Sequence, residues 1–147
     1  MGKKVLILSN HFITLFNFRK ELIQRLIKEG HEVTLSLPQS DENQFFRDMG
    51  CRIIDTPVDR RGFNPLRDFE LILRYIKMMR MIHPDIVFSY TIKPNIYGSI
   101  ASNITKNKQV NNITGTGGTF MKRSVVSEIV KLLYKITVKK SHKVFFQ

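Results

Sequence analysis

The stretch KKVLILSNHFITLFNFRKELIQRLIKEGHEVTLSL, residues 3–37, decides the fold of this chain. It opens with an apolar run over residues 3–9 that predicts a buried strand, and it closes with a second such run over residues 31–37. Between them, apolar side chains recur at helical spacing: Leu15, Phe18, Leu22 and Leu26. They predict a helix over residues 14–29 that Gly30 terminates. A strand, a helix and a second strand at this spacing predict a parallel β-α-β unit.

The same alternation continues to the last residue. Further strands are predicted over residues 52–55, 85–90, 109–114 and 144–146. Further helices are predicted over residues 41–49 (capped by Ser40 or Asp41), 66–82, 95–103 and 124–140. Helices between consecutive strands require right-handed crossovers, which place helices on both faces of a parallel sheet. The predicted fold class is α/β, a doubly wound, Rossmann-like single domain over residues 1–147.

Composition indicates a folded globular chain, because 42% of its 147 residues are hydrophobic. The single cysteine, Cys51, excludes an internal disulfide framework and fits a reducing compartment. Neither a signal-peptide pattern nor an apolar run long enough to span a membrane occurs in the sequence. We therefore expect a cytoplasmic chain.

The charge of the chain indicates a polyanionic partner. It has 24 Lys and Arg residues against 12 Asp and Glu, a formal net charge of +12. Such an excess favours nucleic acid or an anionic membrane surface. Aromatic residues do not alternate with the lysines in a stacking pattern, so we expect no nucleic-acid partner.

The loops that follow the strands carry the candidate binding residues, because strand carboxyl ends form the ligand crevice of such a sheet. These candidates are Asn10, His11, Thr14, Asn17, Arg60, Arg61, Asn64, Tyr90, Lys93, Asn95, Thr114, Gly115, Thr116, Gly117 and Gly118. They form a rim of hydrogen-bond donors and cations with hardly any carboxylate. A phosphate-bearing or sugar ligand suits such a rim.

Four of these residues have both a functional and a structural interpretation. His11 is a candidate general base or ligand of a substrate oxygen, and it is equally a candidate helix cap. Arg60 and Arg61 have the geometry to bind a phosphate, although adjacent loop arginines are commonly just solvated. Lys93 opens a helix whose free N–H groups favour an anion, although Pro94 also fits ordinary helix initiation.

Two other kinds of site are disfavoured. The Gly115-Thr116-Gly117-Gly118 loop lacks the third glycine of a dinucleotide fingerprint, since Phe120 stands there, and it follows the fifth strand instead of the first. We therefore expect no nicotinamide cofactor. The four histidines have no metal-ligand spacing, so we expect no metal.

The predicted helix over residues 124–140 is basic and amphipathic. Its apolar side, which we expect to cover the sheet, carries Val126, Ile129, Val130, Leu133 and Thr137. Its opposite side and the segment before it carry the candidate membrane-binding residues: Lys122, Arg123, Lys131, Lys135 and Lys139. These cations either contact anionic headgroups or form an ordinary solvated face.

Four segments in this order carry a family resemblance: residues 9–33, 55–68, 83–102 and 111–120. Together they resemble the amino-terminal half of bacterial family 4 glycosyltransferases, most closely the subgroup that builds capsule, O-antigen and linker glycans on a polyprenyl diphosphate. The resemblance implies a GT-B fold with two Rossmann-like domains. It implies that residues 1–147 are the amino-terminal, acceptor-binding domain and that the nucleotide-sugar domain lies outside this chain.

The resemblance also implies the activity: retaining, metal-independent transfer from a nucleotide sugar to a lipid-linked saccharide, without a cofactor and with the nucleotide sugar as co-substrate. Many members have a catalytic histidine after the fifth strand, where this chain reads Thr114-Gly115-Thr116. His11 is the remaining candidate for a catalytic residue. The basic helix resembles the membrane-docking helix of lipid-acceptor members, which implies a peripheral protein on the inner face of the cell membrane.

Two functions follow. The first is the acceptor-binding half of a glycosyltransferase, inactive as an isolated fragment. The second is a noncatalytic, membrane-anchoring subunit that recruits a separate donor-binding chain.

Overall fold

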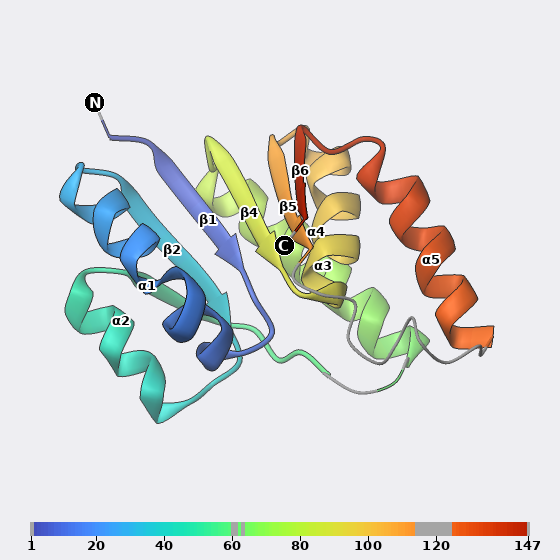
Figure 1. Cartoon of the computed structure of the whole chain (residues 1–147), viewed down its shortest axis with the longest axis horizontal. Coiled ribbons are helices and arrows are strands. Elements are labelled where there is room, and N and C mark those ends of the chain that lie inside the picture. Colours follow the sequence, from blue (N-terminus) through green and yellow to red (C-terminus); the bar gives the residue numbers. More distant parts are fainter. Residues whose placement is uncertain (1, 60–61, 63, 114–124, 147) are drawn as a thin grey trace.

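The chain folds as a six-stranded, fully parallel sheet with helices on both faces (Figure 1). The computed structural model describes residues 2–59, 62, 64–113 and 125–146. The strands are β1 (Lys4–Leu8), β2 (Glu32–Leu37), β3 (Arg52–Asp55), β4 (Ile86–Tyr90), β5 (Gln109–Ile113) and β6 (Lys143–Phe146). Their order in the sheet, β3-β2-β1-β4-β5-β6, confirms the predicted doubly wound α/β class.

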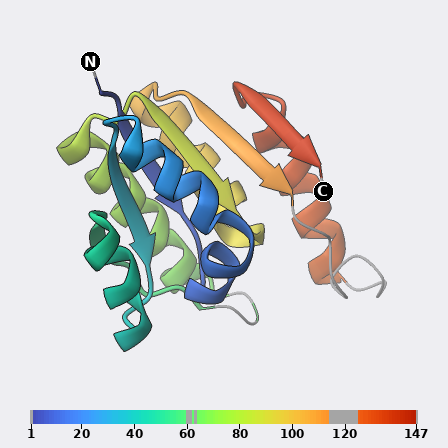
Figure 2. The same cartoon turned by 60° about the vertical axis from the view of Figure 1, so that its left-hand side comes forward.

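The helices are α1 (Phe12–Lys28), α2 (Gln44–Met49), α3 (Pro65–Ile82), α4 (Ile92–Thr105) and α5 (Val125–Val138), with a 3₁₀ turn at Asp41–Asn43 before α2. The strand order and the right-handed crossover rule assign α1 and α2 to one face and α3, α4 and α5 to the other, and the two views agree (Figures 1 and 2). All the strand carboxyl ends consequently meet at one edge of the sheet.

Strand β1 shows how the sequence builds two cores. Val5 and Ile7 point to the α1 and α2 face, whereas Leu6 and Leu8 point to the α3 and α4 face, and none is more than 3% exposed. A central parallel strand is covered on both sides, so its sequence is a continuous apolar run instead of an alternating one. This explains why KVLIL was recognisable as a strand.

Several element boundaries differ from the predicted ones. Helix α1 begins at Phe12 instead of residue 14, and α4 begins at Ile92 instead of residue 95. Ser40, one of two predicted caps, accepts a hydrogen bond from the Glu42 N–H before α2. The end of this helical segment is confirmed, since Gly50 adopts φ 106° as the left-handed residue after Met49.

Candidate functional site

The turn between β1 and α1 contains no glycine and is held by two side chains. The Ser9 hydroxyl, buried at the end of the sheet, donates to the His11 carbonyl at 3.2 Å and accepts from the His11 N–H at 3.4 Å. His11 Nδ1 then accepts the Ile13 N–H at 3.1 Å. His11 is therefore the cap of α1, which confirms its structural interpretation.

The capping bond also determines what the imidazole can offer a ligand. Because Nδ1 accepts a hydrogen bond, the neutral ring carries its proton on Nε2. In this state His11 is a donor, suited to an oxygen of a ligand. Using Nδ1 as a base would instead remove the cap, so the geometry favours hydrogen-bond donation over proton abstraction.

Around this turn lies a hollow of about 260 Å³. Its walls come from the β1–α1 turn and from the segments after β2 and β3: Asn10, His11, Phe12, Pro38, Gln39, Ser40, Glu42 and Val58. Of the other predicted residues on α1, Thr14 is half-buried and Asn17 is exposed, and neither lines the hollow.

Asn64 lies at the start of α3 and serves as its cap. Its Oδ1 accepts from the N–H groups of Leu66 at 3.2 Å and Arg67 at 3.4 Å. The side-chain oxygen is thus already occupied by the helix. Arg60 and Arg61, the predicted phosphate ligands beside it, lie outside the described residues.

Lys93 lies in the first turn of α4, as predicted, but it is buried. Its Nζ is 2.8 Å from Asp68 Oδ1 on α3, and the two side chains are 7% and 9% exposed. Burial raises the pKa of the neighbouring Tyr97 hydroxyl, and the Asp68 carboxylate raises that pKa further. The pair joins the amino-terminal ends of α3 and α4.

Asn95 and Tyr90 are also packed inside the domain. The Asn95 Oδ1 accepts from the Ser89 hydroxyl at 2.7 Å and its Nδ2 donates to the Asn112 carbonyl at 2.9 Å. Tyr90 is 1% exposed, and the Arg19 guanidinium lies 4.9 Å from its ring centre. In this structure both residues support the strand ends from within.

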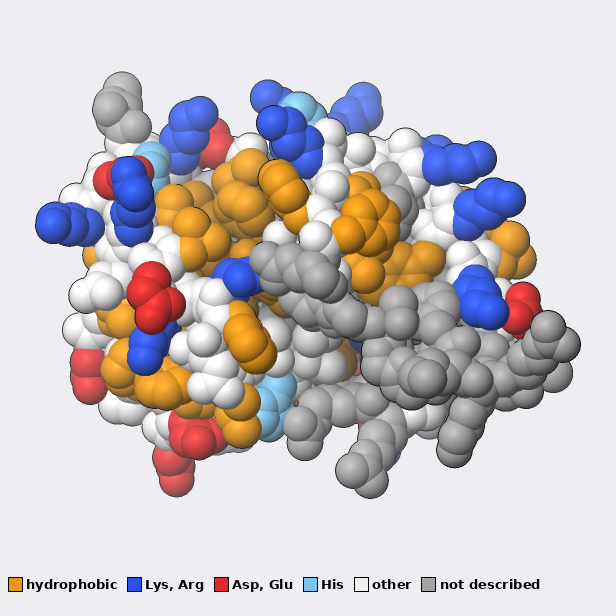
Figure 3. Space-filling view, in the orientation of Figure 1, with side chains coloured by type: hydrophobic (Ala, Val, Ile, Leu, Met, Phe, Trp, Pro, Cys, Tyr) orange, Lys and Arg blue, Asp and Glu red, His pale blue; other side chains and the backbone are white. Residues whose placement is uncertain are grey.

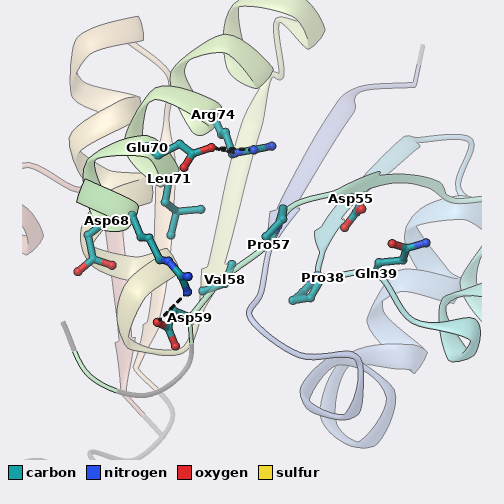
Figure 4. A pocket seen from close by; sticks show the side chains of 11 residues that line it. Pro38, Gln39, Asp55, Pro57, Val58, Asp59, Asp68, Glu70, Leu71 and Arg74 are labelled. Atoms are coloured by element: carbon teal, nitrogen blue, oxygen red, sulfur yellow. Dashed lines mark hydrogen bonds and ion pairs between the residues drawn. The ribbon is translucent and has the colours of Figure 1, made fainter. Parts of the chain in front are cut away.

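A second, larger pocket of about 540 Å³ opens between α3 and the segments that follow β2 and β3 (Figure 4). Its lining includes four of the twelve carboxylates of the chain: Asp55, Asp59, Asp68 and Glu70. The expectation of a rim with hardly any carboxylate is therefore wrong. Asp55 ends β3, and the others precede or begin α3, so all four reach the carboxyl edge.

The sequence contained a signal for this pocket. Asp55 closes a predicted strand, so its position at the carboxyl edge follows directly from the strand prediction. The two carboxylates on α3 lie within its first two turns, behind the Asn64 cap. The predicted site was limited to the loops that follow the strands. It therefore left out residues in the first turns of helices, which lie at the same edge of a parallel sheet.

The surface of α5 is partly apolar and partly cationic. Leu133, Tyr134 and Thr137 turn inward, whereas Ile129, Leu132 and Ile136 are 48%, 58% and 53% exposed. The prediction that Ile129 covers the sheet is therefore wrong, whereas Leu133 and Thr137 of the same predicted apolar side do turn inward. The side chains of Val126 and Val130 lie outside the described part of the structure.

Three predicted membrane-binding lysines are exposed on α5 or just after it: Lys131, Lys135 and Lys139. Lys131 also contacts Glu128 at 3.0 Å. Figure 3 shows cationic side chains over α5 and along the upper edge, where the strands begin. The two remaining candidates, Lys122 and Arg123, lie outside the described residues, as does the whole Thr114 to Gly118 loop.

Two general features of the described residues bear on function. None of their helices is both long and apolar enough to cross a membrane. They also contain no group of three or more His, Cys, Asp or Glu side chains arranged to hold a metal ion.

Comparison with known proteins defines the class. Residues 4–147 match the model of the family described as Glycosyl transferase 4-like, and this chain belongs to that family. Over 144 residues it is 25% identical to an N,N'-diacetylbacillosaminyl-diphospho-undecaprenol alpha-1,3-N-acetylgalactosaminyltransferase of Campylobacter jejuni. The match covers 95% of this chain and 38% of that enzyme, so the chain spans less than half of its relative.

Solved structures agree on the fold. MurG of Acinetobacter baumannii superposes with a TM-score of 0.67 at 12% identity, covering 99% of this chain and 41% of MurG. The Anabaena protein Alr3699/HepE, solved with UDP and glucose, gives 0.67 at 14% identity, covering 97% of this chain and 38% of that one. A Listeria monocytogenes protein described as a UDP-N-acetylglucosamine 2-epimerase gives 0.69 at 13% identity, with coverage of 99% and 39%. The domain therefore has the fold of one half of a GT-B structure.

Proposed function

We propose that this domain is the acceptor-binding half of a retaining glycosyltransferase that moves a sugar from a nucleotide donor to a polyprenyl-diphosphate-linked saccharide. Family membership and the activity of the Campylobacter relative support this substrate class. The donor site belongs to a second domain outside these residues. An isolated 147-residue chain is then expected to bind acceptor and membrane but to transfer no sugar.

The outward surface of α5 is the observation that carries the proposal. An enzyme with a polyprenyl acceptor works at a bilayer surface, and α5 presents aliphatic side chains beside a row of lysines. Aliphatic groups enter the boundary between headgroups and acyl chains, and each nearby lysine contributes about 1 kcal/mol on an anionic surface. The domain would dock on the inner face of the cell membrane.

At the carboxyl edge, we assign the hollow around His11 to the acceptor diphosphate. The Nε2 proton of His11 and the Asn10 amide would supply donors. Arg60 and Arg61, which lie outside the described residues, are proposed as the source of positive charge. Lys93 acts indirectly by fixing α4, since its ammonium is buried against Asp68. Stabilisation of the nucleotide diphosphate that departs from the donor, and not a histidine base, would carry most of the catalysis.

Cosedimentation with phosphatidylglycerol vesicles tests the membrane assignment. We expect Leu132→Ser with Ile136→Ser to weaken binding about tenfold, because two exposed aliphatic anchors are lost. The matched control is Ile104→Ser, a similarly exposed isoleucine (52%) at the end of α4. Binding should also fall with rising salt.

Two results would count against the proposal. If the α5 double variant bound as tightly as the Ile104→Ser control, α5 would not be the docking surface. If the 147-residue chain turned over a nucleotide sugar unaided, it would hold a donor site, and the assignment as an acceptor half would be wrong.

A further inference from the structure

The 540 Å³ pocket beside α3 has no role in the function proposed so far. Its floor is apolar and comes from three segments: Pro38, Pro57, Val58 and Leu71. Its rim is polar, with Gln39 and Asp55 on one side and α3 on the other (Figure 4). Its size falls within the range of ordinary small-molecule sites.

The charges on the α3 side of the pocket are already paired. Glu70 Oε1 lies 2.8 Å from Arg74 Nη2, Asp59 Oδ2 lies 3.7 Å from Arg67 Nη1, and Asp68 turns away to Lys93. Among the described residues, Asp55 contacts no cation. The described lining residues therefore carry a neutral to slightly negative net charge, which disfavours a diphosphate and suits an uncharged ligand rich in hydroxyl donors.

The pocket adjoins the hollow around His11. Pro38, Gln39 and Val58 line both spaces, so the two are neighbours at the carboxyl edge. One end offers the His11 donor, and the other offers carboxylate and amide acceptors over an apolar floor. A ligand with a phosphate at one end and neutral sugar at the other matches this order.

We infer that the pocket beside α3 is a sugar subsite, in which Asp55 and Gln39 bind hydroxyl or acetamido groups of an uncharged sugar unit of the acceptor. This inference rests on the proposed function for the identity of the acceptor, and it assigns specificity to residues outside the diphosphate site. A single sugar unit of about 15 heavy atoms is expected to bind with a Kd of about 1 mM or weaker.

A two-dimensional ¹H–¹⁵N NMR titration of the 147-residue chain with methyl N-acetyl-α-glucosaminide tests the subsite. We expect saturable shifts of the amides of Gln39, Asp55 and Leu71. Asp55→Ala should raise the Kd about tenfold, because a hydrogen bond to a charged acceptor is lost. Glu32→Ala is the control, since it removes an exposed strand carboxylate at the opposite edge of the sheet.

The outcomes separate the two proposals. Absent or nonsaturable shifts, shifts located elsewhere, or equal affinities of the Asp55→Ala and Glu32→Ala variants would overturn the subsite. Titration with inorganic pyrophosphate provides the second arm, with shifts expected at Asn10 and His11. If pyrophosphate binds there and the glycoside does not bind, the diphosphate assignment stands without the sugar subsite. If the glycoside binds and pyrophosphate does not, the subsite stands without the diphosphate site.

Discussion

At the residue scale, Gly98 shows how closely α4 approaches the sheet. A Cβ at this position would lie 2.7 Å from Leu8 Cδ1 and 3.2 Å from Gln109 Nε2. Alanine normally stabilises a helix interior relative to glycine by about 1 kcal/mol. Here the overlap with a buried leucine outweighs that gain, so the absence of a side chain is a packing requirement.

We therefore predict that Gly98→Ala lowers the free energy of unfolding by about 1–3 kcal/mol. Urea denaturation followed by circular dichroism measures the change. Asn103→Ala, at an exposed position of the same helix, is the control and should stay within about 0.5 kcal/mol of the parent. A stabilised Gly98→Ala variant would show that α4 does not pack against Leu8 as described.

His11 combines a cap with a proposed ligand contact, and two substitutions separate these roles. His11→Ala should cost about 1 kcal/mol of stability, whereas His11→Asn keeps a capping acceptor and should cost little. Both should weaken pyrophosphate binding, because neither supplies the Nε2 donor. Equal stability of the two variants would contradict the capping role, and unchanged pyrophosphate affinity would contradict the ligand role.

Cys51 lies in the core between the sheet and helices α1 and α2, and its contribution to stability depends on pH. Burial raises the pKa of its thiol to about 12, from an ordinary value of 9.0. The folded state keeps this proton at a pH where the unfolded chain has lost it. The stability that this group contributes is therefore full below about pH 8.5 and is lost as the pH rises toward 12.

We predict that Cys51 reacts with a disulfide reagent at pH 8 only after unfolding, because both burial and the raised pKa of its thiol suppress the thiolate. The rate of labelling with and without urea measures this protection. A cysteine introduced at exposed position 103 should react at once in the folded protein. Rapid native labelling of Cys51 would mean that β3 and α2 open readily.

At the scale of elements, the buried pair of Lys93 and Asp68 joins α3 to α4. Lys93→Met should cost about 3–5 kcal/mol, because it leaves the Asp68 carboxylate buried without its cation. Adding Asp68→Leu should recover part of that loss. The exposed ion pair of Lys131 and Glu128 is the control, and Lys131→Met should cost less than about 1 kcal/mol of stability. Thermal denaturation of the three variants and the parent checks the order.

The elements themselves were largely predictable from the sequence, for identifiable physical reasons. Continuous apolar runs marked the buried parallel strands, and Gly30 and Gly50 marked helix ends. The start of α1 was predicted two residues late because it was placed from the apolar spacing that begins at Leu15, although His11 was already a candidate cap.

The candidate site was less predictable than the fold. Its location at the carboxyl edge followed from topology, but the burial of Lys93 and Asn95 depends on how α3, α4 and α5 pack, and that of Tyr90 on how α1 packs, which local sequence does not encode. The orientation of α5 was also ambiguous, because apolar residues occur on both its inner and outer sides. Its periodicity therefore allowed Ile129 to be placed inward.

At the scale of the whole molecule, the net charge of +12 is unevenly distributed. Cationic side chains lie over α5 and along the edge where the strands begin (Figure 3). Four carboxylates line the pocket at the opposite edge (Figure 4). This separation suits a domain that approaches an anionic surface with one side and holds a partly uncharged acceptor at another.

Hydrogen–deuterium exchange of the 147-residue chain on nanodiscs that carry undecaprenyl-diphosphate-linked N-acetylglucosamine tests the central claim most directly. The reference is the same chain on nanodiscs that contain only the anionic lipid. The account predicts added protection with the acceptor at the carboxyl edge, in peptides that cover residues 10–14, 38–40 and 55–59. Equal protection of these segments on both kinds of nanodisc would contradict an acceptor site at this edge.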